Sequence, residues 1–137
     1  MTGSAWSIRS GKPEDVGRLL TAGLFEQAMQ ARKDKHSADA DSLISQLARR
    51  NPSDPDVRLL AAQSLLEDRK DPRAALAAAD AIPVADSQPR LRTRIGLLKA
   101  DAYVAVGMPD SARALLTRLV AQFPANTRLK DRLAKLH

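Results

Sequence analysis

The sequence contains no cysteine and few aromatic residues, and each absence excludes a class of protein. Among 137 residues there are one Trp, one Tyr and two Phe. Without cysteine the chain has no disulfide, no thiolate metal ligand and no cysteine nucleophile. No apolar run approaches the roughly 20 residues that a membrane-spanning helix needs. The lack of cysteine suits both cytosol and periplasm. We expect a cytoplasmic protein, or a periplasmic one if a signal segment has been removed.

Signals of catalysis are equally scarce. The two histidines are His36, in a charged junction, and His137, the last residue. Asp54 and Asp56 flank a proline, as helix caps and turns do, and do not resemble a pair of catalytic carboxylates. No Gly-rich phosphate loop, metal-ligand spacing or serine nucleophile motif is present. The sequence therefore predicts no enzyme, no catalytic residue, no metal and no cofactor.

The apolar residues that are present are mainly Leu and Ala, which favour close-packed helices over sheets. Hydrophobic residues make up 44% and charged residues 28%, with a net charge of +6 and a pI near 10.2. This charge allows attraction to nucleic acid, anionic lipid or an acidic protein, and selects none of them. The length predicts a single domain over 13–137, after a flexible leader or tag remnant at 1–12.

The stretch from Arg92 to Asn126 shows the local pattern most clearly. Apolar residues recur at helical spacing on both sides of a break at Gly107–Asp110, and Pro124 ends the second run. This pattern predicts two amphipathic helices joined by a tight turn.

The same pattern recurs along the chain. Ala28, Ala62 and Ala100 are separated by 34 and 38 residues, and Ala40, Ala74 and Ala112 repeat the same two spacings. Small residues let two antiparallel helices approach closely where they cross. The recurrence predicts repeated helical hairpins with alanine at each crossing.

These residues resemble the tetratricopeptide repeat, a 34-residue helical hairpin. The last unit matches best, with Tyr103, Gly107, Ala112, Leu116 and Pro124 at the family's positions and Gly96 at the place of its Trp. The resemblance covers about 105 residues and implies an all-α, right-handed superhelical stack of antiparallel helix hairpins. The implied units are about 21–54, 55–91 and 93–126, followed by a C-terminal capping helix over 127–136. The implied packing residues are Ala28, Ala40, Ala62, Ala74, Ala100, Ala112, Gly107, Pro52 and Pro124.

A second register is open for the first unit. Gly23 resembles the family's inter-helix turn, which would make 13–22 and 24–35 separate helices. The match of the first unit to the last, at an offset of 72 residues, favours one helix across Gly23.

The resemblance implies a non-catalytic scaffold that binds a peptide or helical segment of another protein, as part of a larger protein or assembly. The concave groove would be lined by the first helix of each unit. The implied groove residues are Phe25, Met29, Arg32, Lys33, Leu59, Gln63, Glu67, Arg94, Leu97 and Asp101. Some family members clamp a partner's C-terminal carboxylate, but here only Arg94 stands at a clamp position. The sequence therefore argues against such a clamp.

Two alternatives depend on other features. Two basic clusters, Arg90 to Arg94 and Arg128 to Lys135, suit nucleic acid or another anionic surface. A continuous basic stripe would favour nucleic acid, whereas mixed charge in the groove would favour a peptide. The last helix carries Leu129, Leu133 and Leu136 on one side. It either caps the third unit or leaves an apolar edge through which the chain forms a homodimer.

Overall fold

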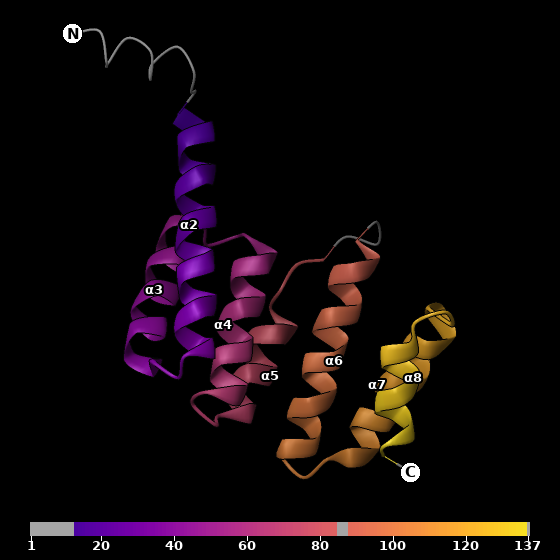
Figure 1. The fold of residues 1–137 in the computed structure, drawn as a ribbon. Helices are drawn as coiled ribbons and strands as arrows, with labels where there is room; N and C mark the ends of the chain where they lie inside the picture. The colour runs from indigo at the N-terminus through magenta and orange to yellow at the C-terminus, as the bar shows by residue number, and fades with distance from the viewer. Residues whose placement is uncertain (1–12, 85–87, 137) are drawn as a thin grey trace, which may run out of the picture. The chain divides into compact units, whose positions relative to one another are not determined.

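The computed structural model describes residues 13–84 and 88–136, with side chains from residue 20 onward. Within these ranges the chain forms seven α-helices and no strand, so the prediction of an all-α helical repeat is confirmed (Figure 1). The leader at 1–12 lies outside the described residues. The helices are α2 (Pro13–Lys33), α3 (Ser37–Arg50), α4 (Pro55–Glu67), α5 (Pro72–Asp80), α6 (Pro89–Ala105), α7 (Pro109–Gln122) and α8 (Thr127–Ala134).

The chain divides into two compact units, Met1–Pro52 and Ser53–His137. The described helices of the first unit are the pair α2 and α3. The second contains the hairpins α4–α5 and α6–α7, with α8 packed against α7 and α6. A single domain over 13–137 stays a prediction.

The first hairpin is held by small and aliphatic residues on facing sides of α2 and α3. Ala28, Ala40 and Leu47 are each at most 1% exposed. The side chains of Thr21 and Asn51 exchange hydrogen bonds, which tie the end of α3 to α2. Because α2 runs unbroken through Gly23, the second register, with helices at 13–22 and 24–35, is wrong.

An aspartate cap followed by a proline begins each of the first two helices of the second unit. The Asp54 carboxylate accepts a hydrogen bond from the Asp56 N–H, 2.9 Å away, directly before Pro55 starts α4. The Asp71 carboxylate accepts one from the Ala74 N–H at 3.1 Å, and Pro72 starts α5. These caps satisfy N–H groups that the first turn leaves unpaired, and proline fits the first position because it has no N–H to lose.

One hydrophobic core joins α4, α5 and α6. Its members are at most 8% exposed and come from all three helices and from the turn that follows α5. They are Leu59, Ala62, Ala79, Ile82, Leu91, Ile95 and Leu98.

The turns inside the hairpins explain an error in the sequence-based packing assignment. In the first and third hairpins two residues separate the helix from the next N-cap, whereas the second has three, from Asp68 to Lys70. The extra residue moves the helix register of α5 forward by one. Ala75 is therefore the fourth residue of its helix, as Ala40 and Ala112 are of theirs, and is 0% exposed. Ala74, which the sequence assigned to this place, is only half-buried.

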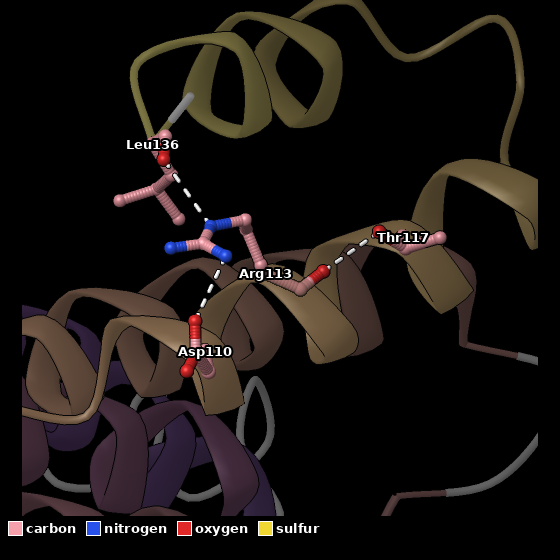
Figure 2. A network of polar contacts seen from close by, with 4 residues as sticks. All are labelled: Asp110, Arg113, Thr117 and Leu136. Atoms are coloured by element: carbon pink, nitrogen blue, oxygen red, sulfur yellow. Dashed lines mark hydrogen bonds and ion pairs between the residues drawn. The ribbon is translucent and has the colours of Figure 1, made fainter.

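Helix α8 packs its leucines inward. Leu129 is 0% exposed and joins a core with Ala100, Ala112, Leu116 and Leu119, and Leu133 and Leu136 are packed against this core. Figure 2 shows Arg113 of α7 bridging to the end of the α8 segment, with Nε donating to the Leu136 carbonyl at 3.2 Å. Its Nη1 also pairs with Asp110 at 2.8 Å. The last helix thus covers the third hairpin.

Candidate partner-binding groove

An open groove of about 1000 Å³ lies within the second unit. Its wall comes from the first half of α6, the start of α4 and the connection between α7 and α8, which are far apart in sequence. The lining residues are Asp56, Gln88, Pro89, Arg90, Leu91, Thr93, Arg94, Leu97, Phe123, Pro124, Ala125, Asn126 and Arg128.

The groove has an apolar part built on Leu97 and Phe123. Both side chains are half-buried and pack against the core of the third hairpin. The Arg92 guanidinium lies 5.7 Å from the centroid of the Phe123 ring, and its Nη2 donates to the Gln122 side chain at 3.1 Å. These contacts fix the ring and place a cation over it.

The charged part of the groove is unbalanced. Among the residues that the structure describes, Arg90, Arg94 and Arg128 line it together with a single acid, Asp56. Arg94 Nη1 is 3.7 Å from Asp56 Oδ1, a long pair between side chains that are 48% and 62% exposed. Arg90 and Arg128 are exposed and have no ion-pair partner among the described residues. The groove therefore carries uncompensated positive charge.

Two of these arginines stand where a helix does not favour them. Arg90 is the second residue of α6 and Arg128 the second of α8, and neither first turn contains an acid. The N-terminal end of a helix is electrically positive, so cations there are unfavourable by a few tenths of a kcal/mol or more. At these positions Arg90 and Arg128 add to the positive potential of the groove and do not stabilise their helices.

Of the predicted groove residues, Arg94 and Leu97 do line this groove. Asp101 lies one turn further along α6, and its carboxylate pairs with Arg132 of α8. Gln63 and Glu67, toward the end of α4, do not line it. Leu59 is 0% exposed in the core between α4 and α6, so its assignment to a binding surface is wrong.

The other four predicted residues belong to the first unit, on α2. Met29 is 52% exposed and Lys33 is exposed, whereas Phe25 and Arg32 are half-buried. A shallower hollow of about 460 Å³ lies between α2 and α3, and none of these four residues lines it. Its lining includes His36, but no three described His, Asp or Glu side chains are grouped as a metal site would require.

The remaining predicted residues were assigned to packing. Ala28, Ala40, Ala62, Ala100 and Ala112 are each at most 1% exposed. Gly107, with φ of 83°, lies in the turn between α6 and α7. Pro52 and Pro124 are exposed in the turns that follow α3 and α7.

Sequence reasoning missed Asp56, Arg90, Phe123 and Arg128 as parts of one site. The sequence does contain a pattern that groups three of them. Asp56, Arg90 and Arg128 are the second residues of α4, α6 and α8. Equivalent positions of successive first helices lie along one face of a helical repeat. Phe123 gives no such signal, since it follows the second helix of its hairpin.

Comparison with known proteins supports the architecture. Residues 93–136 match a family model described as tetratricopeptide repeat, over α6 from Thr93, α7 and α8. No curated protein and no solved structure matches the chain. Repeats of this family generally mediate interactions between proteins and are typically not catalytic. The match shows a tetratricopeptide repeat at residues 93–136, and the other hairpins share its arrangement, with buried alanines where their helices cross.

Proposed function

We propose that this protein is a non-catalytic interaction module whose second unit binds a segment of a partner protein in the groove between α6 and the α7–α8 connection. The observation that carries the proposal is the groove itself. Its half-buried apolar side chains lie together with exposed arginines on one open surface of about 1000 Å³, and two of these arginines, Arg90 and Arg128, have no ion-pair partner within the described ranges. Peptide-binding sites combine these two features, apolar contacts for affinity and a few polar groups for orientation.

Self-association through α8 receives no support from the geometry. Leu129 is fully buried and Leu133 and Leu136 are half-buried, so the helix presents no leucine edge. The large hydrophobic side chains that are exposed among the described residues are Leu20, Met29, Val104 and Met108, none of them on α8.

No described helix has the length and hydrophobicity to cross a bilayer.

The groove proposal is tested by a steric block. Ala125 is exposed and lines the groove, so Ala125→Trp fills it with a neutral side chain. Ala114, exposed on α7 and outside the groove, gives the matched control Ala114→Trp. Random peptides displayed on phage are first selected against the unaltered protein.

We expect Ala125→Trp to weaken the selected peptides by about tenfold or more, which corresponds to about 1.4 kcal/mol of binding free energy. The Ala114→Trp protein should bind them as the unaltered protein does. Equal binding by all three proteins would show that the groove is not the site.

A further inference from the structure

We infer that the segment bound in this groove is acidic, with Asp or Glu side chains that pair with Arg90, Arg94 and Arg128. This inference rests on the proposed function, because it names the class of partner for the same site. It follows from the charge of the lining. The groove presents three guanidinium groups against one carboxylate, and two of the three have no ion-pair partner among the described residues.

The spacing of the arginines also indicates how the acids are arranged. Arg90 and Arg94 are four residues apart on α6, so their side chains leave the helix about 6 Å apart along its axis. Two residues of an extended chain span about 7 Å. Acids at alternate positions of an extended segment therefore match this pair, and the side chains between them face the other way.

The lining favours a protein carboxylate over a nucleic acid. Phe123 is the one aromatic side chain among the described lining residues, and Arg92 lies over its ring, so the covered face is closed to a stacking base. Single-stranded nucleic acids are generally held by such stacking. Leu97 and Phe123 offer apolar contacts that an amphipathic peptide uses and a phosphate chain does not.

Asp56 acts in this arrangement as an internal competitor. Its carboxylate lies 3.7 Å from the Arg94 guanidinium and therefore competes with an incoming acid for that group. Its backbone N–H, not its side chain, makes the capping contact with Asp54. Asp56→Asn therefore frees Arg94 without removing the cap, and we expect acidic segments to bind about two- to fivefold tighter, the range of one exposed ion pair.

The probe for the direct test is a fluorescein-labelled nine-residue peptide with Glu at alternate positions and Leu or Ala between them. A second peptide carries Gln in place of each Glu, and a 30-nucleotide single-stranded DNA of mixed sequence is the third probe. Binding is followed by fluorescence anisotropy at about 0.05 M and about 0.5 M salt, since exposed charge pairs are strongly screened at the higher value.

The charge variant is Arg90→Glu with Arg128→Glu. Both substitutions place an acid in the first turn of a helix, which the dipole favours, so the fold is expected to persist. The matched control is Arg118→Glu with Lys130→Glu, which changes net charge equally at exposed positions outside the groove.

We expect the Glu peptide to bind at least about tenfold tighter than the Gln peptide at low salt, to lose about tenfold in the charge variant and to keep its affinity in the control. Equal affinity of the Glu and Gln peptides, binding of neither, or an unaffected charge variant would overturn the acidic inference. DNA that binds tighter than the Glu peptide and is lost in the charge variant would overturn it in favour of nucleic acid. The proposed function is tested by a different result. It is contradicted if the display-selected peptides bind to the Ala125→Trp protein as they do to the unaltered protein.

Discussion

Lys35, Lys70 and Gly107 share a left-handed backbone, with φ of 65°, 58° and 83°. Each stands directly before the N-cap of the second helix of its hairpin. In the first and third turns the N-cap N–H reaches back five residues, from His36 to the Ala31 carbonyl and from Met108 to the Tyr103 carbonyl. This pattern ends a helix with one residue in the left-handed region, where glycine is least strained.

Replacing the lysines by glycine should therefore stabilise the protein. We expect Lys35→Gly and Lys70→Gly each to raise the free energy of unfolding by about 0.5–1 kcal/mol, because the left-handed conformation costs a residue with a Cβ roughly that much. Gly107→Ala should lower it by about 1 kcal/mol for the same reason. Urea denaturation checks all three, and the opposite sign at either lysine would contradict the turn geometry.

The register of α5 gives a second test at the scale of single residues. Ala75 is fully buried, so Ala75→Leu should overpack the second hairpin and cost about 1–3 kcal/mol. Ala74 is only half-buried, and Ala74→Leu should cost less than about 1 kcal/mol. Thermal denaturation of the two variants side by side measures the difference. If Ala74→Leu were the more damaging, the register with one extra turn residue would be wrong.

At the scale of whole helices, the boundaries were largely predictable, because local signals set them. Asp54–Pro55, Asp71–Pro72 and Asn126 are residues that typically begin helices, and they do so here; the Asn126 side chain accepts from the Leu129 N–H at 3.2 Å. The start of α3 carries no such signal, because its N-cap is His36, which makes no side-chain cap bond. There the turn that ends α2 fixes where α3 begins, so the helix needs no cap of its own.

The contacts that attach α8 to the third hairpin are also understood at the scale of the helix. Its apolar contacts rest on Leu129, and its end is tied to α7 by Arg113 (Figure 2). Asp110 is 89% exposed, so its ion pair with Arg113 contributes little, and the bond to the Leu136 carbonyl is the more important contact.

Arg113→Ala should loosen the end of α8 without unfolding the unit. We expect the amides of residues 133–136 to exchange with solvent about two- to fivefold faster, because one hydrogen bond contributes about 0.5–1 kcal/mol here. Hydrogen exchange read by NMR measures this, with Arg118→Ala on the same helix as the control. Unchanged exchange rates in α8 would show that its apolar contacts alone hold it.

At the scale of the molecule, the sequence revealed the repeat but not the site. The recurring alanines report local crossings of helices, and such crossings occur within each hairpin. The groove instead joins residues as distant as Asp56 and Arg128, and its composition depends on which side chains the packing leaves exposed. Leu59 illustrates the limit: helical spacing places it on a first helix, but only the fold shows that α6 covers it.

The measurement that tests the central claim most directly is an NMR titration of isotope-labelled protein with a display-selected peptide. The amide signals that move should belong to the lining of the groove, at Arg90, Arg94, Leu97 and the segment 123–128. The outer surface of α7 around Ala114 and Arg118 should not respond. Shifts confined to α2, or to any surface that leaves 88–97 and 123–128 unchanged, would contradict the assignment of this groove as the binding site.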